Sequence, residues 1–236
     1  MTYRVRRRRA PEAALVAIAL TLAGALAGCA ELSARGSEPG PPPTVAPTPS
    51  PTPAEAAPTS VVVVGDSLAD GEGFDATPED PGSWKMYLDE SIEVTGGWWR
   101  NGATTVNMAD NLELSEGEVL VVMGGTNDAA RNVPVSDTVS SVKRIVEKVQ
   151  TDAVILCAIP PLAKHQAAVR RINTALETLA NDSGWRWIDP WELYRDGDDW
   201  TNGGSLDGMH ASLPAYRSAG IVISQAIEQA SIARVR

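Results

Sequence analysis

Three unbroken apolar runs place the strongest constraint on the fold of this chain: Val61–Val64, Val119–Met123 and Val154–Ile159. A strand with one face in water alternates apolar and polar residues, whereas an unbroken apolar run suits a strand that is buried on both faces of a parallel sheet. Shorter strand candidates are Ser91–Thr95 and Trp185–Ile188. Together these segments predict a central, mainly parallel sheet of five strands.

Segments with helical periodicity separate these strands. They are Trp84–Asp89, Thr105–Leu112, Val135–Val149, Gln166–Asn181 and Pro214–Ala230. Strands that alternate with helices favour a sheet covered by helices on both faces. The predicted fold class is therefore α/β, a three-layer α/β/α sandwich, in which functional residues gather at the carboxyl ends of the strands.

The first residues read as an export signal rather than as part of this fold. A cluster of arginines precedes the apolar segment Ala13–Ala27, which at about 15 residues is short for a membrane-spanning helix. The segment ends in Leu-Ala-Gly-Cys, which resembles the lipobox of bacterial lipoproteins. That resemblance implies cleavage before Cys29, acylation of Cys29 and an outward-facing location on the cell membrane. The alternative is an ordinary signal peptide with an incidental cysteine.

The segment that follows, 37–60, is rich in Pro, Thr, Ala and Ser and has almost no large apolar residues. Such a composition cannot bury enough surface to fold, and its proline density predicts a semi-extended spacer of up to about 3 Å per residue. The predicted organisation is a signal peptide over 1–28, a lipidated cysteine and disordered spacer over 29–59, and one folded domain over 60–236.

Charge and cysteine content exclude several functions. The chain has a net charge of -10, and loss of a leader that carries five arginines and one glutamate makes it more negative. This argues against a nucleic-acid partner and gives no electrostatic attraction to anionic lipid headgroups. If Cys29 carries lipid, Cys157 has no partner, so no disulfide framework is expected and Cys157 reads as a small buried core residue.

A serine stands directly after the first predicted strand, in VVVVGDSLADGEG. Ser67 lies where a nucleophile would be held, although the Gly-x-Ser-x-Gly elbow is absent because Ala69 replaces the second glycine. A serine nucleophile needs a base, and the chain has two histidines. His210 follows Asp207 by three residues, a spacing that puts both on one face, whereas His165 has no nearby acid and reads as a surface residue.

Two further strand ends carry polar or glycine residues. Asn127, in the MGGTND run, could offer its side-chain amide to an oxyanion, although Gly, Asn and Asp also form ordinary turns. Gly102, in WWRNGATT, follows the second predicted strand and could direct a backbone N–H at the same oxygen. Acidic residues at calcium-loop-like spacing begin at Asp66, but Leu68 occupies a ligand position there, so no metal site is expected.

Taken together, in this order on these strand ends, the blocks GDSL, NGATT, GTND and DGMH resemble those of the SGNH (GDSL) hydrolase family. The resemblance covers residues 60–230 and implies the flavodoxin-like fold of that family. It implies Ser67 as nucleophile, His210 as base and Asp207 as the orienting acid, with an oxyanion hole made by Ser67, Gly102 and Asn127. It also implies two-step acyl transfer without a metal or organic cofactor.

Two departures from the family pattern stand out. The last block often has proline after the histidine, whereas Ala211 follows here and Pro214 is the nearest proline. The second block commonly has more glycine and serine than this chain has, since residues 98–101 are Trp, Trp, Arg and Asn. The assignment of Gly102 rests on this less typical block.

The sequence leaves the substrate open. Trp98, Trp99 and Trp200 lie near catalytic blocks, where they could stack on sugars or simply pack in the core. Within the family that it resembles, the GTND block is similar to those of the carbohydrate-esterase and small-ester branches, and the compact domain leaves little length for a lid or a long acyl tunnel. We therefore expect an esterase for small-molecule or glycan esters with short acyl groups, including O-acetyl groups, and we expect it to be a monomer. The alternatives are a lysophospholipase or other lipid esterase, a cell-envelope transacylase, and a catalytically silent binding module.

Overall fold

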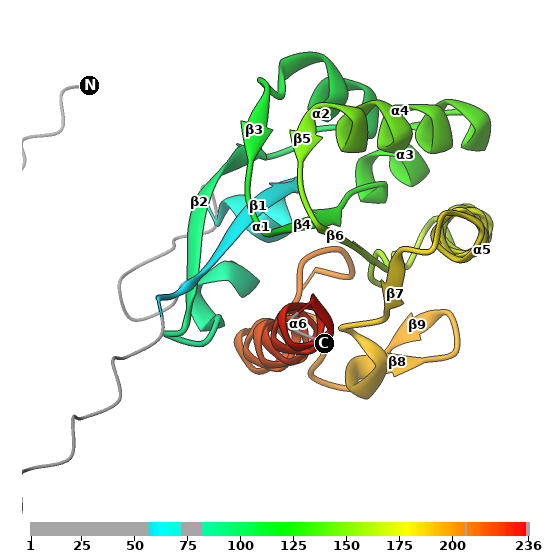
Figure 1. The fold of residues 1–236 in the computed structure, drawn as a ribbon. Helices are drawn as coiled ribbons and strands as arrows, with labels where there is room; N and C mark the ends of the chain where they lie inside the picture. The colour runs from blue at the N-terminus through cyan, green and yellow to red at the C-terminus, as the bar shows by residue number, and fades with distance from the viewer. Residues whose placement is uncertain (1–56, 72–81, 206, 235–236) are drawn as a thin grey trace, which may run out of the picture. The chain divides into compact units, whose positions relative to one another are not determined.

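The computed structural model describes residues 57–71, 82–205 and 207–234 (Figure 1). The predicted signal peptide, Cys29 and nearly all of the predicted spacer lie outside the described residues. Within the part of the chain that is described, no helix is both long and apolar enough to cross a membrane.

The centre of the fold is a parallel sheet whose five strands have the order β2-β1-β4-β6-β7. Every neighbouring pair in this sheet is parallel, which confirms the predicted architecture. The chain passes from β1 to one edge and then returns to the other side, so a topological switch point lies between β1 and β4. The strands are β1 (Thr59–Gly65), β2 (Ile92–Trp99), β4 (Val119–Met123), β6 (Ala153–Cys157) and β7 (Arg186–Ile188).

Helices cover both faces of this sheet and form the outer layers of the sandwich (Figure 1). The first face carries α2 (Thr105–Asn111), α3 (Thr126–Arg131), α4 (Val135–Glu147) and α5 (Gln166–Ser183). The second face carries α6 (Leu213–Arg234), the 3-10 helix η1 (Trp84–Tyr87) and the short α1 (Ser67–Asp70). The remaining 3-10 helix among the described residues is η2 (Glu192–Tyr194).

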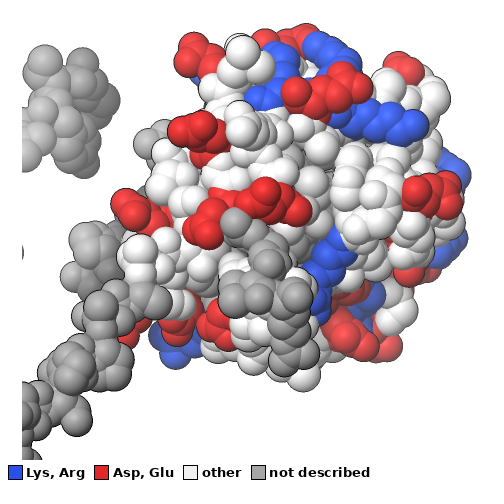
Figure 2. Space-filling view, in the orientation of Figure 1, with Lys and Arg blue, Asp and Glu red and all other residues white. Residues whose placement is uncertain are grey.

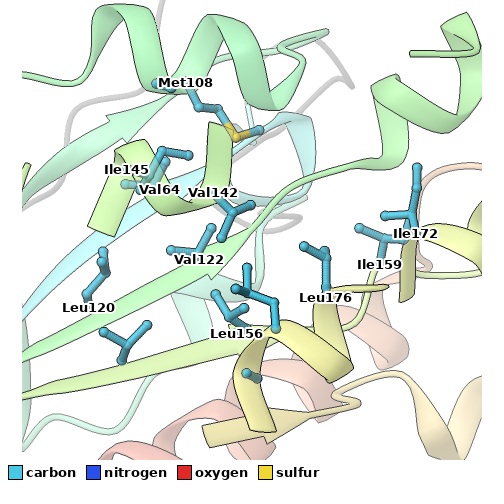
Figure 3. Packing of buried hydrophobic residues seen from close by; sticks show 14 of the residues in the cluster. Val64, Met108, Leu120, Val122, Val142, Ile145, Leu156, Ile159, Ile172 and Leu176 are labelled. Carbon is cyan, nitrogen blue, oxygen red and sulfur yellow. The ribbon is translucent and has the colours of Figure 1, made fainter. Parts of the chain in front are cut away.

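Each unbroken apolar run contributes side chains to two hydrophobic cores, one on each face of the sheet. Along β1, Val62 and Val64 face the layer of α2, α4 and α5, whereas Val61 and Val63 face α6. All four valines are fully buried. Figure 3 shows the first core, where Val64 and Val122 lie below side chains of α2 and α4. Because successive residues of a strand point to opposite faces, only a continuous apolar run can fill both cores.

Several predicted boundaries differ from those observed. Strand β2 continues past Thr95 to Trp99, and the helix expected over 84–89 is the 3-10 helix η1. Helix α4 ends at Glu147 because Val149 belongs to β5 (Val149–Gln150), which pairs with β3 (Ser115–Glu116). The acidic residues near position 198 lie in a hairpin between β8 (Arg195–Asp196) and β9 (Asp199–Trp200).

Strand β6 ends two residues before the predicted end at Ile159. The side-chain amide of Asn173 on α5 accepts a hydrogen bond from the Ile159 N–H and donates one to the Ile159 carbonyl, at 2.9 and 3.1 Å. These bonds satisfy the backbone of Ile159 without a neighbouring strand. Cys157, the last residue of β6, is buried and unbridged as expected, and burial raises the pKa of its thiol.

Candidate active site

Ser67 lies at the switch point of the sheet, directly beyond the carboxyl end of β1. Asp66 caps the short helix α1, because one of its carboxylate oxygens accepts a hydrogen bond from the Leu68 N–H at 3.1 Å. Ser67 is therefore the first residue of that helix, with its side chain near the surface although only 6% of the residue is exposed. The strand and the cap together fix the direction of the Ser67 hydroxyl.

The loop before α6 brings His210 and Asp207 to this serine. The Nε2 atom of His210 lies 3.1 Å from the Oγ atom of Ser67, and its Nδ1 atom lies 2.7 Å from the Oδ2 atom of Asp207. A carboxylate at Nδ1 holds the proton of neutral imidazole on that nitrogen. The Nε2 atom is then the acceptor that faces the Ser67 hydroxyl.

The environment of Asp207 favours its ionised form. Partial burial alone would raise the pKa of Asp207, but three hydrogen bonds together outweigh burial and lower it. These bonds come from the His210 ring and from the backbone N–H groups of Met209 and His210. The carboxylate charge therefore remains available to stabilise an imidazolium on His210.

A serine that sequence reasoning did not single out braces this loop. The Oγ atom of Ser205 donates to the His210 carbonyl at 2.6 Å and accepts from the Gly208 N–H at 2.9 Å. Ser205 and Ala211 also form an isolated β-bridge. The only sequence signal was a hydroxyl residue two positions before Asp207, which is too common a pattern to distinguish a brace from a surface serine.

Asn127 is the second residue of α3, which begins directly after β4 at the same edge of the sheet. Its side-chain amide has no hydrogen-bond partner among the described residues, although the residue is only 9% exposed. Gly102 belongs to the turn between β2 and α2 and has a φ of +73°, a conformation that L side chains rarely adopt. The GTND segment, for which an ordinary turn was the alternative, begins the short helix α3.

Asp128, the residue after Asn127, connects α3 to α2 and α4 through hydrogen bonds. Asp128 is fully buried and its carboxylate accepts hydrogen bonds from the Thr105 N–H, the Thr105 hydroxyl and the Thr138 hydroxyl, at 2.9, 2.5 and 3.0 Å. Thr105 begins α2, three residues after Gly102, whereas Asp128 directly follows Asn127. The Asp128 network therefore fixes the two predicted oxyanion donors relative to each other, a role that the sequence did not reveal.

A second carboxyl group is buried next to the nucleophile. Asp66 is fully buried, and its Oδ2 atom has no hydrogen-bond partner among the described residues. Burial raises the pKa of Asp66 to about 7, a shift that the Leu68 N–H opposes and the charge of Asp128 increases. Burial therefore favours the neutral form of Asp66 far more than that of an exposed aspartate.

The other predicted candidates occupy structural positions. His165 directly precedes α5 and makes no hydrogen bond with Ser67. Trp98 and Trp99 pack against the two cores from the end of β2, and Trp200 packs edge-on against Trp191 with a centroid distance of 5.8 Å. These contacts favour core packing over sugar stacking for the three tryptophans. Among the described residues, no group of three His, Cys, Asp or Glu side chains could hold a metal ion.

Comparison with known families assigns this arrangement to a class. The sequence model of the GDSL-like Lipase/Acylhydrolase family matches residues 63–217, which is more than half of the chain and includes every residue of the site described above. The chain belongs to this family and is a hydrolase that acts on ester bonds. No curated protein sequence matches the chain.

Solved structures share the fold at low sequence identity. A protein of the lipolytic G-D-S-L family from Desulfitobacterium hafniense is 20% identical, with 71% of this chain and 98% of that chain covered and a TM-score of 0.59. A GDSL-like lipase from Bacteroides thetaiotaomicron is 18% identical, with 73% and 89% covered and a TM-score of 0.55. A carbohydrate acetylesterase family member from Sinorhizobium meliloti is 18% identical, with 73% and 98% covered and a TM-score of 0.52.

Proposed function

We propose that the protein is an exported, membrane-anchored serine esterase that hydrolyses short-chain acyl esters, including O-acetyl esters of carbohydrates. The observation that carries this proposal is the hydrogen-bonded series from Asp207 through His210 to Ser67 at the switch point of the sheet. A nucleophile, a base within hydrogen-bond reach and a carboxylate that orients the base are the parts that acyl transfer to a serine needs.

In the first half of the reaction, the Ser67 hydroxyl attacks the ester carbonyl while the Nε2 atom of His210 takes its proton. The negative oxygen of the tetrahedral intermediate accepts hydrogen bonds from the backbone N–H groups of Ser67 and Gly102 and from the Asn127 amide. The bond from carbon to the alcohol oxygen then breaks, and His210 returns the proton to that oxygen. The alcohol leaves, and the acyl group remains on Ser67.

In the second half, water replaces the alcohol. His210 removes a proton from the water as it attacks the acyl carbonyl, and the same donors hold the oxyanion. The bond between the carbonyl carbon and Oγ of Ser67 breaks, Oγ regains the proton from His210, and the carboxylic acid leaves. Transfer to a sugar hydroxyl in place of water would make the protein a transacylase with the same residues.

Short acyl chains and carbohydrate alcohols are the proposed substrate class for two reasons. The acetylesterase from Sinorhizobium meliloti acts, by its name, on acetylated carbohydrates, and it shares the fold of this chain. The protein is acidic overall, and Figure 2 shows acidic side chains in several separate groups on the face in view, with basic groups between them. A surface of this kind offers little attraction to the headgroups of an anionic bilayer, which disfavours the lipid-esterase alternative.

The test is hydrolysis of p-nitrophenyl esters from acetate to palmitate by the full chain and by its Ser67→Ala variant. We expect cleavage that peaks at acetate or butyrate and that is lost in Ser67→Ala, with unchanged circular dichroism. A peak at long chains would favour the lipid-esterase alternative, and transfer to added sugar acceptors would indicate a transacylase. A folded Ser67→Ala variant with the wild-type rate would refute the serine mechanism, and absence of hydrolysis by the wild type would favour the binding module.

A further inference from the structure

An arginine lies against the predicted oxyanion hole. Arg131 ends α3, one helical turn after Asn127, so both side chains lie on the same side of that short helix. Its Nη2 atom is 3.4 Å from the position that a Cβ atom at Gly102 would occupy. The Arg131 guanidinium is therefore adjacent to Gly102 and within one turn of Asn127, the two predicted oxyanion donors outside the nucleophile loop.

Arg131 and a second arginine nearby, Arg100, form no ion pair within the described part of the chain. Three other arginines form ion pairs with aspartates, namely Arg144 with Asp110, Arg170 with Asp198 and Arg195 with Asp189. Among the described residues, neither Arg131 nor Arg100 forms an ion pair, and both are exposed.

Two carboxylates in neighbouring segments, Asp128 and Asp70, have other hydrogen-bond partners. Asp128 is buried and accepts from Thr105 and Thr138, and the Oδ2 atom of Asp70 accepts from the Asn101 N–H at 2.7 Å. The basic residue in the last turn of α3 also suits the helix dipole. That effect accounts for a positive charge on α3 but leaves the contact with Gly102 and the presence of Arg100 unexplained.

A polar depression of about 250 Å³ adjoins Gly102 on the surface between β2 and α2. Besides Ala103, its walls are Trp98, Arg100, Asn101, Gly102, Asn107 and Asn111. Asn107 uses its amide oxygen to cap α2, and Asn111 donates to the Asn107 carbonyl, so Arg100 is the group in this depression that is suited to an anion. Because Gly102 belongs both to this depression and to the predicted oxyanion hole, a group attached close to the reacting ester can reach the depression.

We propose that Arg131 and Arg100 select esters whose alcohol carries an anionic group, a carboxylate or phosphate, next to the acyl group. This proposal rests on the proposed function and narrows its substrate class to acidic glycans. Guanidinium groups bind carboxylates and phosphates through paired, charge-assisted hydrogen bonds, and an acidic protein repels such substrates unless a local positive charge compensates. Arg100 lines the depression, and Arg131 lies against Gly102 at its border with the predicted oxyanion hole.

The test compares matched substrates on the full chain. Acetylated methyl glucuronoside as the free acid is compared with its primary amide, which has the same shape without the charge, and with acetylated methyl glucoside 6-phosphate. Released acetate gives kcat/KM for each substrate. We expect the wild type to prefer the acid or the phosphate over the amide, and Arg131→Gln to reduce that preference by about three- to tenfold. Which anion is preferred separates uronate-containing from phosphate-containing glycans.

Three further measurements test the charge itself. Arg131→Lys should keep part of the preference, because lysine retains the charge but cannot form the paired hydrogen bonds. Salt of about 0.5 M should weaken the preference, because exposed charges are then screened within about 5 Å. The matched control is Arg186→Gln, which removes an arginine at the amino end of β7. Ser67, in contrast, lies beyond the carboxyl end of β1. Arg186→Gln should keep the wild-type preference.

Two results would overturn the proposal. The first is an equal acid-to-amide ratio in the wild type and in folded Arg131→Gln. The second is a wild type that cleaves p-nitrophenyl acetate through Ser67 but discriminates against both anionic substrates, in which case the proposed esterase function stands and this inference fails. Loss of hydrolysis of every ester would refute the esterase function and this inference with it.

Discussion

At the scale of single residues, neighbours in the sequence have separate tasks although both are buried. Asn127 keeps its amide free of protein partners among the described residues, while the adjacent Asp128 is buried and accepts three hydrogen bonds. The same division of tasks occurs at Asp66 and Ser67, where a fully buried carboxyl group precedes the candidate nucleophile. In both pairs the aspartate positions the backbone, and its neighbour contributes a side chain to the candidate site.

Replacement of Asn127 by alanine tests its role as an oxyanion donor. The amide would bind the negative oxygen of the tetrahedral intermediate more strongly than the neutral carbonyl of the substrate, so Asn127→Ala should lower kcat by about two orders of magnitude. KM should change little, because ground-state binding depends on other contacts. Steady-state kinetics on p-nitrophenyl acetate provide the measurement. An increase in KM at constant kcat would instead assign Asn127 to substrate binding.

Replacement of Asp66 by asparagine tests the buried carboxyl group. Because the folded-state pKa of Asp66 is raised to about 7, its contribution to stability is full below the unfolded-state pKa, near 4, and is lost as the pH rises to about 7. Asparagine does not ionise, and its amide oxygen can still accept from the Leu68 N–H. The free energy of unfolding of Asp66→Asn relative to wild type should therefore increase by roughly 2–4 kcal/mol between about pH 4 and 8.

Urea unfolding at several pH values measures this difference. Asp137→Asn is the matched control, because it is the same substitution at an exposed position in the first turn of α4. Parallel stability curves for wild type and Asp66→Asn would show that Asp66 is ionised in the folded protein throughout this range.

At the scale of elements, the end of β2 depends on one glycine. Gly97 has a φ of +125°, and a Cβ atom there would overlap the carbonyl of Val63 on the neighbouring strand β1. Gly97→Ala should therefore lower the free energy of unfolding by about 3 kcal/mol or more. Gly96→Ala is the matched control, because a Cβ at Gly96 meets no atom within 4 Å. Thermal unfolding of both variants gives the comparison, and equal losses would contradict the close approach.

The sequence predicted the elements that bury large apolar faces and missed those that tertiary contacts create. Val61–Val64 and Val119–Met123 were evident because a strand between two cores must be apolar on both faces. The residues after Thr95 were missed because Gly96 and Gly97 are poor strand formers, and their strand conformation follows from pairing with β1. Helix α3 was missed because it has six residues, too few for a helical period.

The same distinction holds for the candidate site. Ser67, Asp207 and His210 could be found because the chemistry restricts the residue types and only two histidines were available. The sequence did not reveal the roles of Ser205, Asp128 and Arg131, because these roles depend on which segments the fold brings together. Asp128 meets Thr105 across 23 positions of the chain, and no local pattern predicts that contact.

At the scale of the whole molecule, the point where the chain enters the described domain lies far from the candidate site. The chain enters the sheet at Thr59, the first residue of β1, and Ser67 follows the last residue of the same strand. A strand of seven residues at about 3.3 Å each puts these two points on the order of 20 Å apart, at opposite edges of the sheet. A spacer attached before Thr59 would therefore leave the site accessible to substrates that are not part of the anchoring membrane.

This arrangement makes the proposed anchor separable from catalysis, which a pair of cysteine variants tests. Growth with a labelled fatty-acid analogue should label the wild type, because Cys29 is the proposed site of acylation. Two or three acyl chains on Cys29 should also give stable attachment to the membrane. The Cys29→Ser variant should carry no label and should no longer enter the detergent phase when the proteins are separated by detergent phase partitioning. It should keep the wild-type kcat on p-nitrophenyl acetate. Cys157→Ser is the control, because Cys157 is buried at the end of β6 and should keep both label and attachment. A labelled Cys29→Ser variant, or an unlabelled wild type, would refute lipidation at Cys29.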